Sequence, residues 1–417
     1  MAANKNSSRL LSNFLSLSAL QIFTYALPLL TLPYLVRVLG VEKYGLVMFA
    51  QSFIMFFIIL VDYGFNLSAT REISVYRDNK EKVSEIYSSV MTIKVFLIFL
   101  SFFILSVVVF SFEKFNQDKE LYLITYLMVV GQGLFPVWYF QGLERMKYIT
   151  GINILSRVIF TVAIFVFVNE ADDYMLVPLL NGLGITIGSL YSLYLIKTSF
   201  KQKFTLQSFD TIRTHFKDST DFFLSRVSVS IYTSANAFVL GLFTNNSMVG
   251  YYSIAEKLYQ AIQGLYGPIS QALYPYVAKE KNITLYKKIF FSVIAVNIIG
   301  VIFMFFLGEP LFTVVFTNEI GSETIKVFYV LLLANLFAVP SVLIGYPFLA
   351  ALGYIKDANN SVIMGSFVHI ISLSLLAYLD LITIYNVAYM VVLTEITVLT
   401  YRISKVYNYR IWNIKII

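Results

Sequence analysis

Basic residues interrupt several of the longest apolar runs of this 417-residue chain. Lys94, Arg157, Arg226 and Lys257 lie within runs long enough to cross a bilayer, and Lys326 lies at the rim of another. An ionised group at the bilayer centre costs about 2.5–3.5 kcal/mol on insertion scales. We therefore expect these side chains to face a water-filled cavity or one another, where cations bind anionic groups such as phosphates.

The depth of each cation decides how strongly it indicates a binding role. Lys326 lies at the end of a run, where a long side chain reaches the interface by snorkelling. Lys94 and Arg226 lie close enough to helix ends for snorkelling and binding to stay equal alternatives. Arg157 and Lys257 lie deeper, so a binding role is favoured for Lys257 and snorkelling is harder for Arg157.

Acidic residues share this depth, namely Asp62, Asp221, Glu256 and Glu395. Glu256 precedes Lys257, but neighbours on a helix project about 100° apart, so the two do not form a simple pair. Glu395 has no obvious partner in the sequence. A neutral carboxyl, a pair with a cation and a site for a coupling ion all stay open for it.

Composition excludes several kinds of chemistry. The chain has no cysteine, which excludes disulfides, thiolate metal sites and cysteine nucleophiles. Its two histidines, His215 and His369, lie far apart in the sequence, so a histidine-rich metal site is not expected. There is no Walker A sequence, so ATP is not expected to drive the protein directly. The net charge of +7 follows from topology and does not indicate nucleic acid.

The elements that must position these charges are transmembrane helices. The hydrophobic fraction is 58%, the charged fraction 13% and the mean hydropathy +0.74, whereas soluble domains average about 45–50% apolar and about 25% charged residues. Continuous runs of about 20 residues predict helices, not barrel strands. We predict an all-α polytopic membrane protein with twelve spans, at 11–36, 45–66, 88–112, 120–141, 149–168, 174–196, 220–243, 250–275, 289–307, 325–350, 358–379 and 382–403.

Loop charges predict the orientation. Of the 31 Lys and Arg residues, the five named above lie at membrane depth, and 22 of the others fall on one side of the predicted membrane. The opposite side holds only Arg37, Lys43, Lys114 and Lys119. By the positive-inside rule both termini are cytoplasmic. The first span is longer than a signal-peptide core, so we interpret it as a retained helix.

The longest cytoplasmic connection divides six predicted helices from six. We predict an N-terminal lobe at 1–197, a linker at 198–219 and a C-terminal lobe at 220–417. Gly45 and Ala50 in span 2 match Gly250 and Ala255 in span 8 at an offset of 205 residues. This match predicts a parallel pseudo-repeat of two six-helix bundles, an architecture suited to alternating access. Coincidence among apolar sequences is the alternative.

Several patches in the first two spans and in span 8 resemble Wzx-type O-antigen flippases. These proteins belong to the multidrug/oligosaccharidyl-lipid/polysaccharide (MOP) exporter superfamily. The resemblance covers the whole chain in length, helix count and halves, but only these patches are specific. They are Leu32-Pro33-Tyr34-Leu35-Val36-Arg37-Val38-Leu39-Gly40, Tyr44-Gly45, Asp62-Tyr63-Gly64-Phe65-Asn66, Thr70-Arg71-Glu72 and Tyr252-Ser253-Ile254-Ala255-Glu256-Lys257-Leu258.

The resemblance implies a flippase and no enzyme activity. Its substrate would be an undecaprenyl-pyrophosphate-linked oligosaccharide for lipopolysaccharide O-antigen, moved to the periplasmic leaflet of the bacterial inner membrane. The fold would be a V-shaped pair of lobes around a cationic cavity. By position, Arg37, Arg71 and Lys257 match basic residues of the family and Asp62 its second-helix pattern, whereas Lys94, Arg157 and Arg226 join the substrate-binding set on depth alone.

The resemblance also bears on cofactors and partners. No cofactor is implied, and Na⁺ or H⁺ is the candidate coupling ion, with Asp62, Glu256 and Glu395 as coupling or charge-pairing residues. The partners would be the lipid-linked oligosaccharide, membrane lipid and the polymerase and chain-length proteins of the same pathway.

Three alternatives stay open at this stage. A drug or cation antiporter of the same superfamily should have an acidic cavity, whereas cations match or outnumber acids at depth here. A membrane enzyme such as an O-antigen polymerase or ligase usually has a large periplasmic loop, and the longest outer loop predicted here is short. A channel or scaffold does not need cations this deep.

Overall fold

The computed structural model describes residues 2–316 and 321–413, with side chains described from residue 20 onward except at 22, 225, 226, 228, 229, 231–233 and 413. Those residues form helices and short connections and no strand, which confirms the predicted all-α class. The first half contains α1 Ala2–Asp62, α2 Phe65–Tyr76, α3 Lys80–Ser111, α4 Glu113–Asn116, α5 Lys119–Thr125, α6 Leu127–Leu134, α7 Val137–Gly142, α8 Met146–Phe167, η1 Ala171–Met175 and α9 Leu176–Thr198. The second half contains α10 Phe209–Phe243, α11 Asn246–Gly264, α12 Gly267–Glu280, α13 Ile283–Phe316, α14 Ser322–Ile344, η3 Gly345–Ala350, α15 Ile355–Tyr378, α16 Ile384–Asn408 and η4 Ile411–Asn413.

Each of the twelve predicted spans overlaps one or more of these helices. Within the described residues, nine helical stretches are long and apolar enough to cross a membrane. One of them, Phe23–Tyr76, includes all of the predicted span 45–66 and the second half of the predicted span 11–36. The chain is therefore a multi-pass membrane protein, and the total of twelve spans stays a prediction.

Glycine and proline residues determine where the helices of the first half are interrupted. Gly40 has φ 71° and ψ 162°, a conformation essentially restricted to glycine, so α1 consists of two arms that meet there. The second arm ends at Asp62, earlier than predicted, because Tyr63 and Gly64 take positive φ values of 44° and 74°. Phe135 is extended ahead of Pro136, which separates α6 from α7 within one predicted span.

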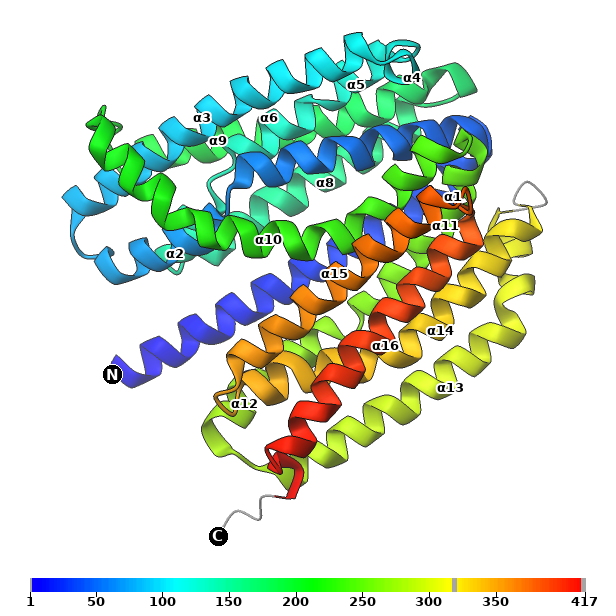
Figure 1. Cartoon of the computed structure of the whole chain (residues 1–417). Coiled ribbons are helices and arrows are strands. Elements are labelled where there is room, and N and C mark those ends of the chain that lie inside the picture. Colours follow the sequence, from blue (N-terminus) through cyan, green and yellow to red (C-terminus); the bar gives the residue numbers. More distant parts are fainter. Residues whose placement is uncertain (1, 317–320, 414–417) are drawn as a thin grey trace. The chain divides into compact units, whose positions relative to one another are not determined.

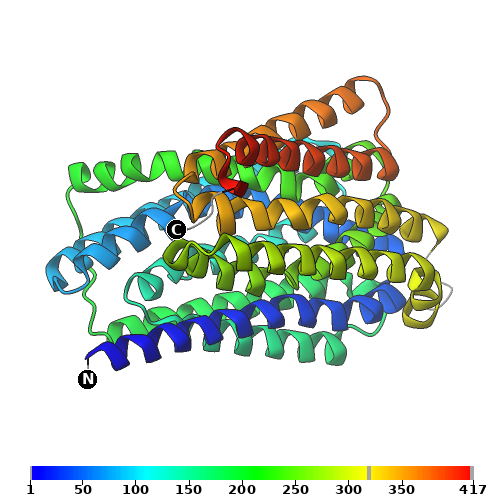
Figure 2. The same cartoon turned by 90° about the horizontal axis from the view of Figure 1, so that it is seen from below.

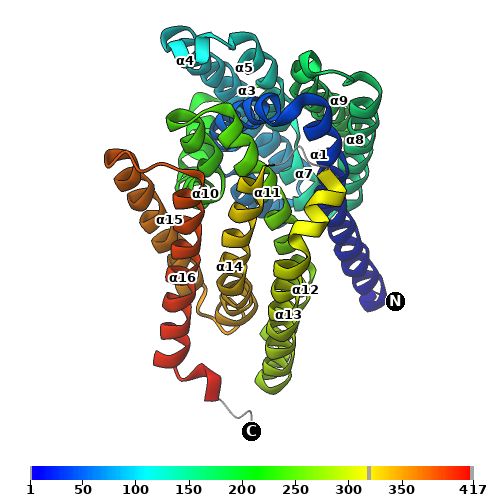
Figure 3. The ribbon, with the colours of Figure 1, turned by 90° about the vertical axis from the view of Figure 1, so that its right-hand side faces the viewer.

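Packing divides the chain into two compact units. Unit 1 comprises Met1–Thr31 and Phe49–Val227, and unit 2 comprises Leu32–Met48 and Ser228–Ile417. Within unit 1, α9 packs against both α6 and α8 (Figure 1). Within unit 2, α14 packs against α13 and α16 (Figure 3), and α15 runs beside α16 (orange and red in Figure 2). The predicted lobes stay a prediction, and of the predicted linker only 199–208 lies outside helices.

The repeat-related glycines Gly45 and Gly250 lie against each other in unit 2. A Cβ atom on Gly45 would collide with the carbonyl oxygen of Asn246, and one on Gly250 would collide with that of Val41. Because both collisions involve backbone atoms, side-chain movement cannot relieve them. Close packing of the second arm of α1 on α11 is thus a sufficient reason for glycine at both positions.

Candidate functional site

The predicted substrate-binding cations differ widely in exposure. Arg37 on α1 and Arg71 on α2 have exposed side chains, and Arg157 on α8 and Lys257 on α11 are half-buried. Lys94 on α3 is only 1% exposed. The side chain of Arg226, on α10, lies outside the described residues.

Unit 1 brings Lys94 together with one predicted acid. Asp62, at the end of the second arm of α1, is close enough for its charge to act on the Lys94 ammonium. Asp62 also accepts a hydrogen bond of 2.5 Å from the side-chain amide of Asn66 on α2. Because α1 ends at Asp62, this side chain contacts α2 and lies near Lys94 of α3.

Unit 2 brings two of the other predicted acids together. Glu256 on α11 and Glu395 on α16 line one cavity, which holds about 540 Å³ of space including its open mouth. Lys257 and Arg402 are the cations whose charges act on Glu256 and Glu395 respectively. The remaining residues of the cavity wall are Asn236, Tyr252, Tyr259, Gln260, Gln263, Leu331, His369, Val391 and Thr394.

A hydrogen-bonded row of three buried residues joins three helices at this cavity. His369 Nε2 lies 2.9 Å from the Asn236 amide oxygen on α10, and His369 Nδ1 lies 2.8 Å from the Thr394 hydroxyl on α16. The Thr394 hydroxyl donates to the Met390 carbonyl at 2.7 Å. Because an amide oxygen only accepts, His369 Nε2 is the donor in its contact with Asn236. The row fixes the imidazole on the wall that also carries the two glutamates.

Arg402 is one of the 22 cations placed on the cytoplasmic side by the orientation argument, but its role differs from that of a loop cation. It is buried, and it donates to the Ser361 hydroxyl at 2.8 Å and to the Ser341 carbonyl at 2.5 Å. Its guanidinium lies over Gly345, where a Cβ atom would be 2.7 Å from the nearest nitrogen. It therefore ties α16 to α15 and to the point where α14 passes into the η3 π-turn.

Sequence reasoning missed part of the cavity wall. Residues 256, 260 and 263 are polar at helical spacing within an apolar span, a signal that predicts a polar stripe on α11. Asn236, His369 and Thr394 carry no such signal, because neutral polar residues occur throughout the apolar spans and nothing in the sequence distinguishes these three from the others. Within the described residues, no group of three or more His, Cys, Asp or Glu side chains is placed to hold a metal ion.

Named proteins of similar sequence match this chain over most of its length. Residues 10–281 match the family described as polysaccharide biosynthesis protein. A relative from Escherichia coli (strain K12) is 32% identical over 71% of this chain and 72% of its own length. A relative from Shigella dysenteriae is 26% identical over 86% of this chain and 91% of its own. Both are named "Putative O-antigen transporter".

Solved structures support the fold. The lipid II flippase MurJ in its inward closed conformation aligns with a TM-score of 0.74 over 95% of this chain and 87% of its own, at 18% identity. An inward-facing multidrug resistance MATE family transporter of the MOP superfamily aligns with a TM-score of 0.65 at 13% identity, over 95% of this chain and 98% of its own. The chain belongs to the polysaccharide biosynthesis protein family, whose model it matches over 10–281 and whose O-antigen transporters it resembles in sequence.

Proposed function

We propose that this protein flips lipid-linked oligosaccharides across the bacterial inner membrane. The substrate is an undecaprenyl-pyrophosphate-linked repeat unit, carried from the cytoplasmic to the periplasmic leaflet by alternating access of two lobes. No bond of the substrate is made or broken, so the protein is a transporter and not an enzyme. The observation that carries the proposal is the match to an O-antigen transporter over 86% of this chain and 91% of that relative.

Basic side chains serve the pyrophosphate. Arginine binds phosphate oxygens through paired N–H donors, whereas lysine acts as a point charge. Among the candidates, Arg37 and Arg71 are exposed and Arg157 and Lys257 are half-buried, so these four can meet a ligand without repacking. Lys94 is sealed in unit 1, and it would reach a ligand only if that unit repacks. Arg226 joins the set on its depth in the sequence.

The cavity of unit 2 holds the coupling ion in this proposal. Glu256 and Glu395 supply carboxylate oxygens, which suit either a proton or a sodium ion. The row through His369 holds the wall in one arrangement. Asp62 lies close enough to Lys94 to balance its charge in unit 1, so it is not assigned to the coupling ion.

A leaflet-protection assay tests the function directly. The protein is placed in liposomes with a fluorescent polyprenyl-pyrophosphate oligosaccharide, and the label that becomes exposed in the outer leaflet is measured over time. We expect protein-dependent translocation that falls in Arg37→Ala and Lys257→Ala but persists in Lys326→Ala, whose side chain is exposed. A chemically altered lipid in place of a translocated one would overturn the proposal in favour of an enzyme.

The acidic cavity favours one second candidate, an antiporter for organic cations. Two glutamates and aromatic rings such as that of Tyr259 are groups that attract a cationic drug. Efflux of an organic cation from loaded liposomes separates the two functions. Efflux that depends on Glu256 and Glu395, together with no flipping of the lipid-linked sugar, would favour the antiporter.

A further inference from the structure

The connection between α9 and α10 combines apolar and basic side chains without any acid. Phe204, Leu206 and Phe209 are 53%, 87% and 77% exposed. Lys197, Lys201 and Lys203 are also exposed, and no acidic residue occurs from 197 to 209. A single exposed apolar side chain needs no explanation, but three within six residues form a patch that water would not favour.

The polar backbone of this connection faces the protein. The Thr205 amide donates to the Ser88 hydroxyl at 3.0 Å, and the Ser84 hydroxyl donates to the Lys203 carbonyl at 2.8 Å. Both serines belong to the first turns of α3. Phe204 and Leu206 flank Thr205 in the chain and are both exposed, so their side chains are not covered by this contact with α3.

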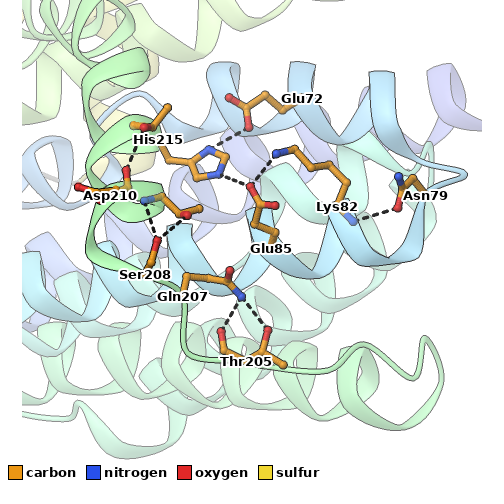
Figure 4. Close-up of polar contacts among 11 residues, drawn as sticks. Glu72, Asn79, Lys82, Glu85, Thr205, Gln207, Ser208, Asp210 and His215 are labelled. Carbon is orange, nitrogen blue, oxygen red and sulfur yellow. Dashed lines mark hydrogen bonds and ion pairs between the residues drawn. The ribbon is translucent and has the colours of Figure 1, made fainter.

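The far end of the connection is fixed as well. The Ser208 hydroxyl accepts a hydrogen bond of 3.2 Å from the Thr211 amide in the first turn of α10. One turn later His215 lies between Glu72, at 3.0 Å, and Glu85, at 3.6 Å (Figure 4). The segment is therefore held in place from α3 to α10, and its apolar face is not an accident of a loose loop.

The contacts with α3 set its depth. A bilayer core of about 30 Å takes about 20 residues of helix at 1.5 Å each, so the last 20 residues of α3 begin near residue 92. Ser88 is the first residue of the predicted span 88–112 and lies one turn, or about 6 Å, outside these 20 residues, which puts it at the edge of the bilayer core. Thr205 is bonded to Ser88, so Phe204 and Leu206 lie at the level of the membrane interface.

We propose that residues 197–209 bind anionic phospholipid headgroups, with Phe204, Leu206 and Phe209 in the interfacial layer and Lys201 and Lys203 on the lipid phosphates. Basic segments beside apolar anchors bind anionic leaflets in this way. The positive-inside orientation makes this the cytoplasmic leaflet. The inference rests on membrane embedding alone and holds whatever substrate is transported.

The absence of cysteine makes a site-specific test clean. In the full chain, Phe204→Cys is labelled with bimane and reconstituted in nanodiscs that contain a shallow nitroxide on phosphatidylglycerol or, at equal mole fraction, on phosphatidylcholine. The matched control is Phe99→Cys, whose parent side chain is 70% exposed on the apolar part of α3. Leu206→Cys repeats the test in case the first label disturbs the segment.

We expect the anionic quencher to act more strongly than the neutral one at positions 204 and 206, and equally at 99. The enrichment should be on the order of five-fold per lysine at low salt. It should vanish in Lys201→Gln/Lys203→Gln and in about 1 M salt, where the Debye length is about 3 Å. Equal quenching by both lipids at 204, or quenching there by aqueous iodide and by neither lipid, would overturn the proposal in favour of a water-exposed or protein-binding loop.

Discussion

Two sites at membrane depth, one in each unit, treat ionisable side chains in opposite ways. In unit 1 a lysine is sealed, since Lys94 is 1% exposed and has the charge of Asp62 close by. In unit 2 two acids, Glu256 and Glu395, lie on the wall of an open cavity. Burial of a charge is costly in both places, but only the second arrangement lets a ligand or an ion exchange with its surroundings.

This difference assigns different tasks to equally deep residues. A sealed lysine whose charge is balanced by a nearby carboxylate contributes to the stability of one conformation, because no ligand reaches Lys94 there. Carboxylates on a cavity wall contribute little to packing and remain available for binding. The depth of a charged residue within an apolar run therefore identifies candidate binding residues. Its accessibility in the fold then separates binding residues from structural ones.

The largest expected effect is the loss of stability when Lys94 is replaced. Lys94→Ala leaves Asp62 without its compensating charge and creates a void, so it should lower the free energy of unfolding by about 3–5 kcal/mol. Thermal unfolding in detergent measures the loss. The control is Lys94→Met/Asp62→Asn, which removes both charges at similar volume and should regain most of the stability. A fully stable Lys94→Ala protein would show that the pair is not structural.

The two glutamates of the open cavity should show the reverse pattern, with a small effect on stability and a large effect on transport. Glu256→Gln and Glu395→Gln keep shape and volume, so the free energy of unfolding should change by less than about 1 kcal/mol. Transport should fall on the order of ten-fold and lose its dependence on Na⁺ or pH. Liposome transport measured across a series of ion gradients checks this. Unchanged ion dependence in both variants would remove the coupling role from the cavity.

Sequence patterns predicted the helices well and the contacts of the charges poorly. Continuous apolar runs determine spans, because lipid requires every backbone group to be bonded within a helix. The partner of Lys94 depends on the break at Tyr63–Gly64, where a non-glycine residue adopts positive φ, and no run of apolar residues encodes that. Likewise His369 meets Asn236 across 133 positions of sequence, a contact that only tertiary packing defines.

His215 is an intermediate case between the sealed and the open charges. Burial alone would lower its pKa, but the hydrogen bond with Glu72 and the charges of Glu72 and Glu85 raise it above the ordinary value of 6.5. A raised folded-state pKa stabilises the protein fully below the unfolded pKa, and this contribution is lost as pH rises through the folded pKa. The contribution of His215 to stability should therefore decline as the pH rises above 6.5.

The matched variant for this site is His215→Asn, which keeps a polar side chain without a titrating proton. We expect it to cost about 1 kcal/mol at pH 6 and less at pH 8. Unfolding midpoints of both proteins across that range give the comparison. A difference that grows with pH would contradict the raised pKa.

The smallest effect should come from a cation that is neither sealed nor in the cavity. The Lys326 side chain is 58% exposed and lies 3.4 Å from Glu323, one turn earlier on α14. Water screens such a pair, so Lys326→Ala should change the free energy of unfolding by less than about 0.5 kcal/mol and leave transport unaltered. Thermal unfolding and the leaflet-protection assay on one preparation measure both quantities. If transport in Lys326→Ala fell as far as in Lys257→Ala, accessibility within the fold would not distinguish cations that bind substrate from cations that do not. Charges at the rim of a span would then belong to the substrate path.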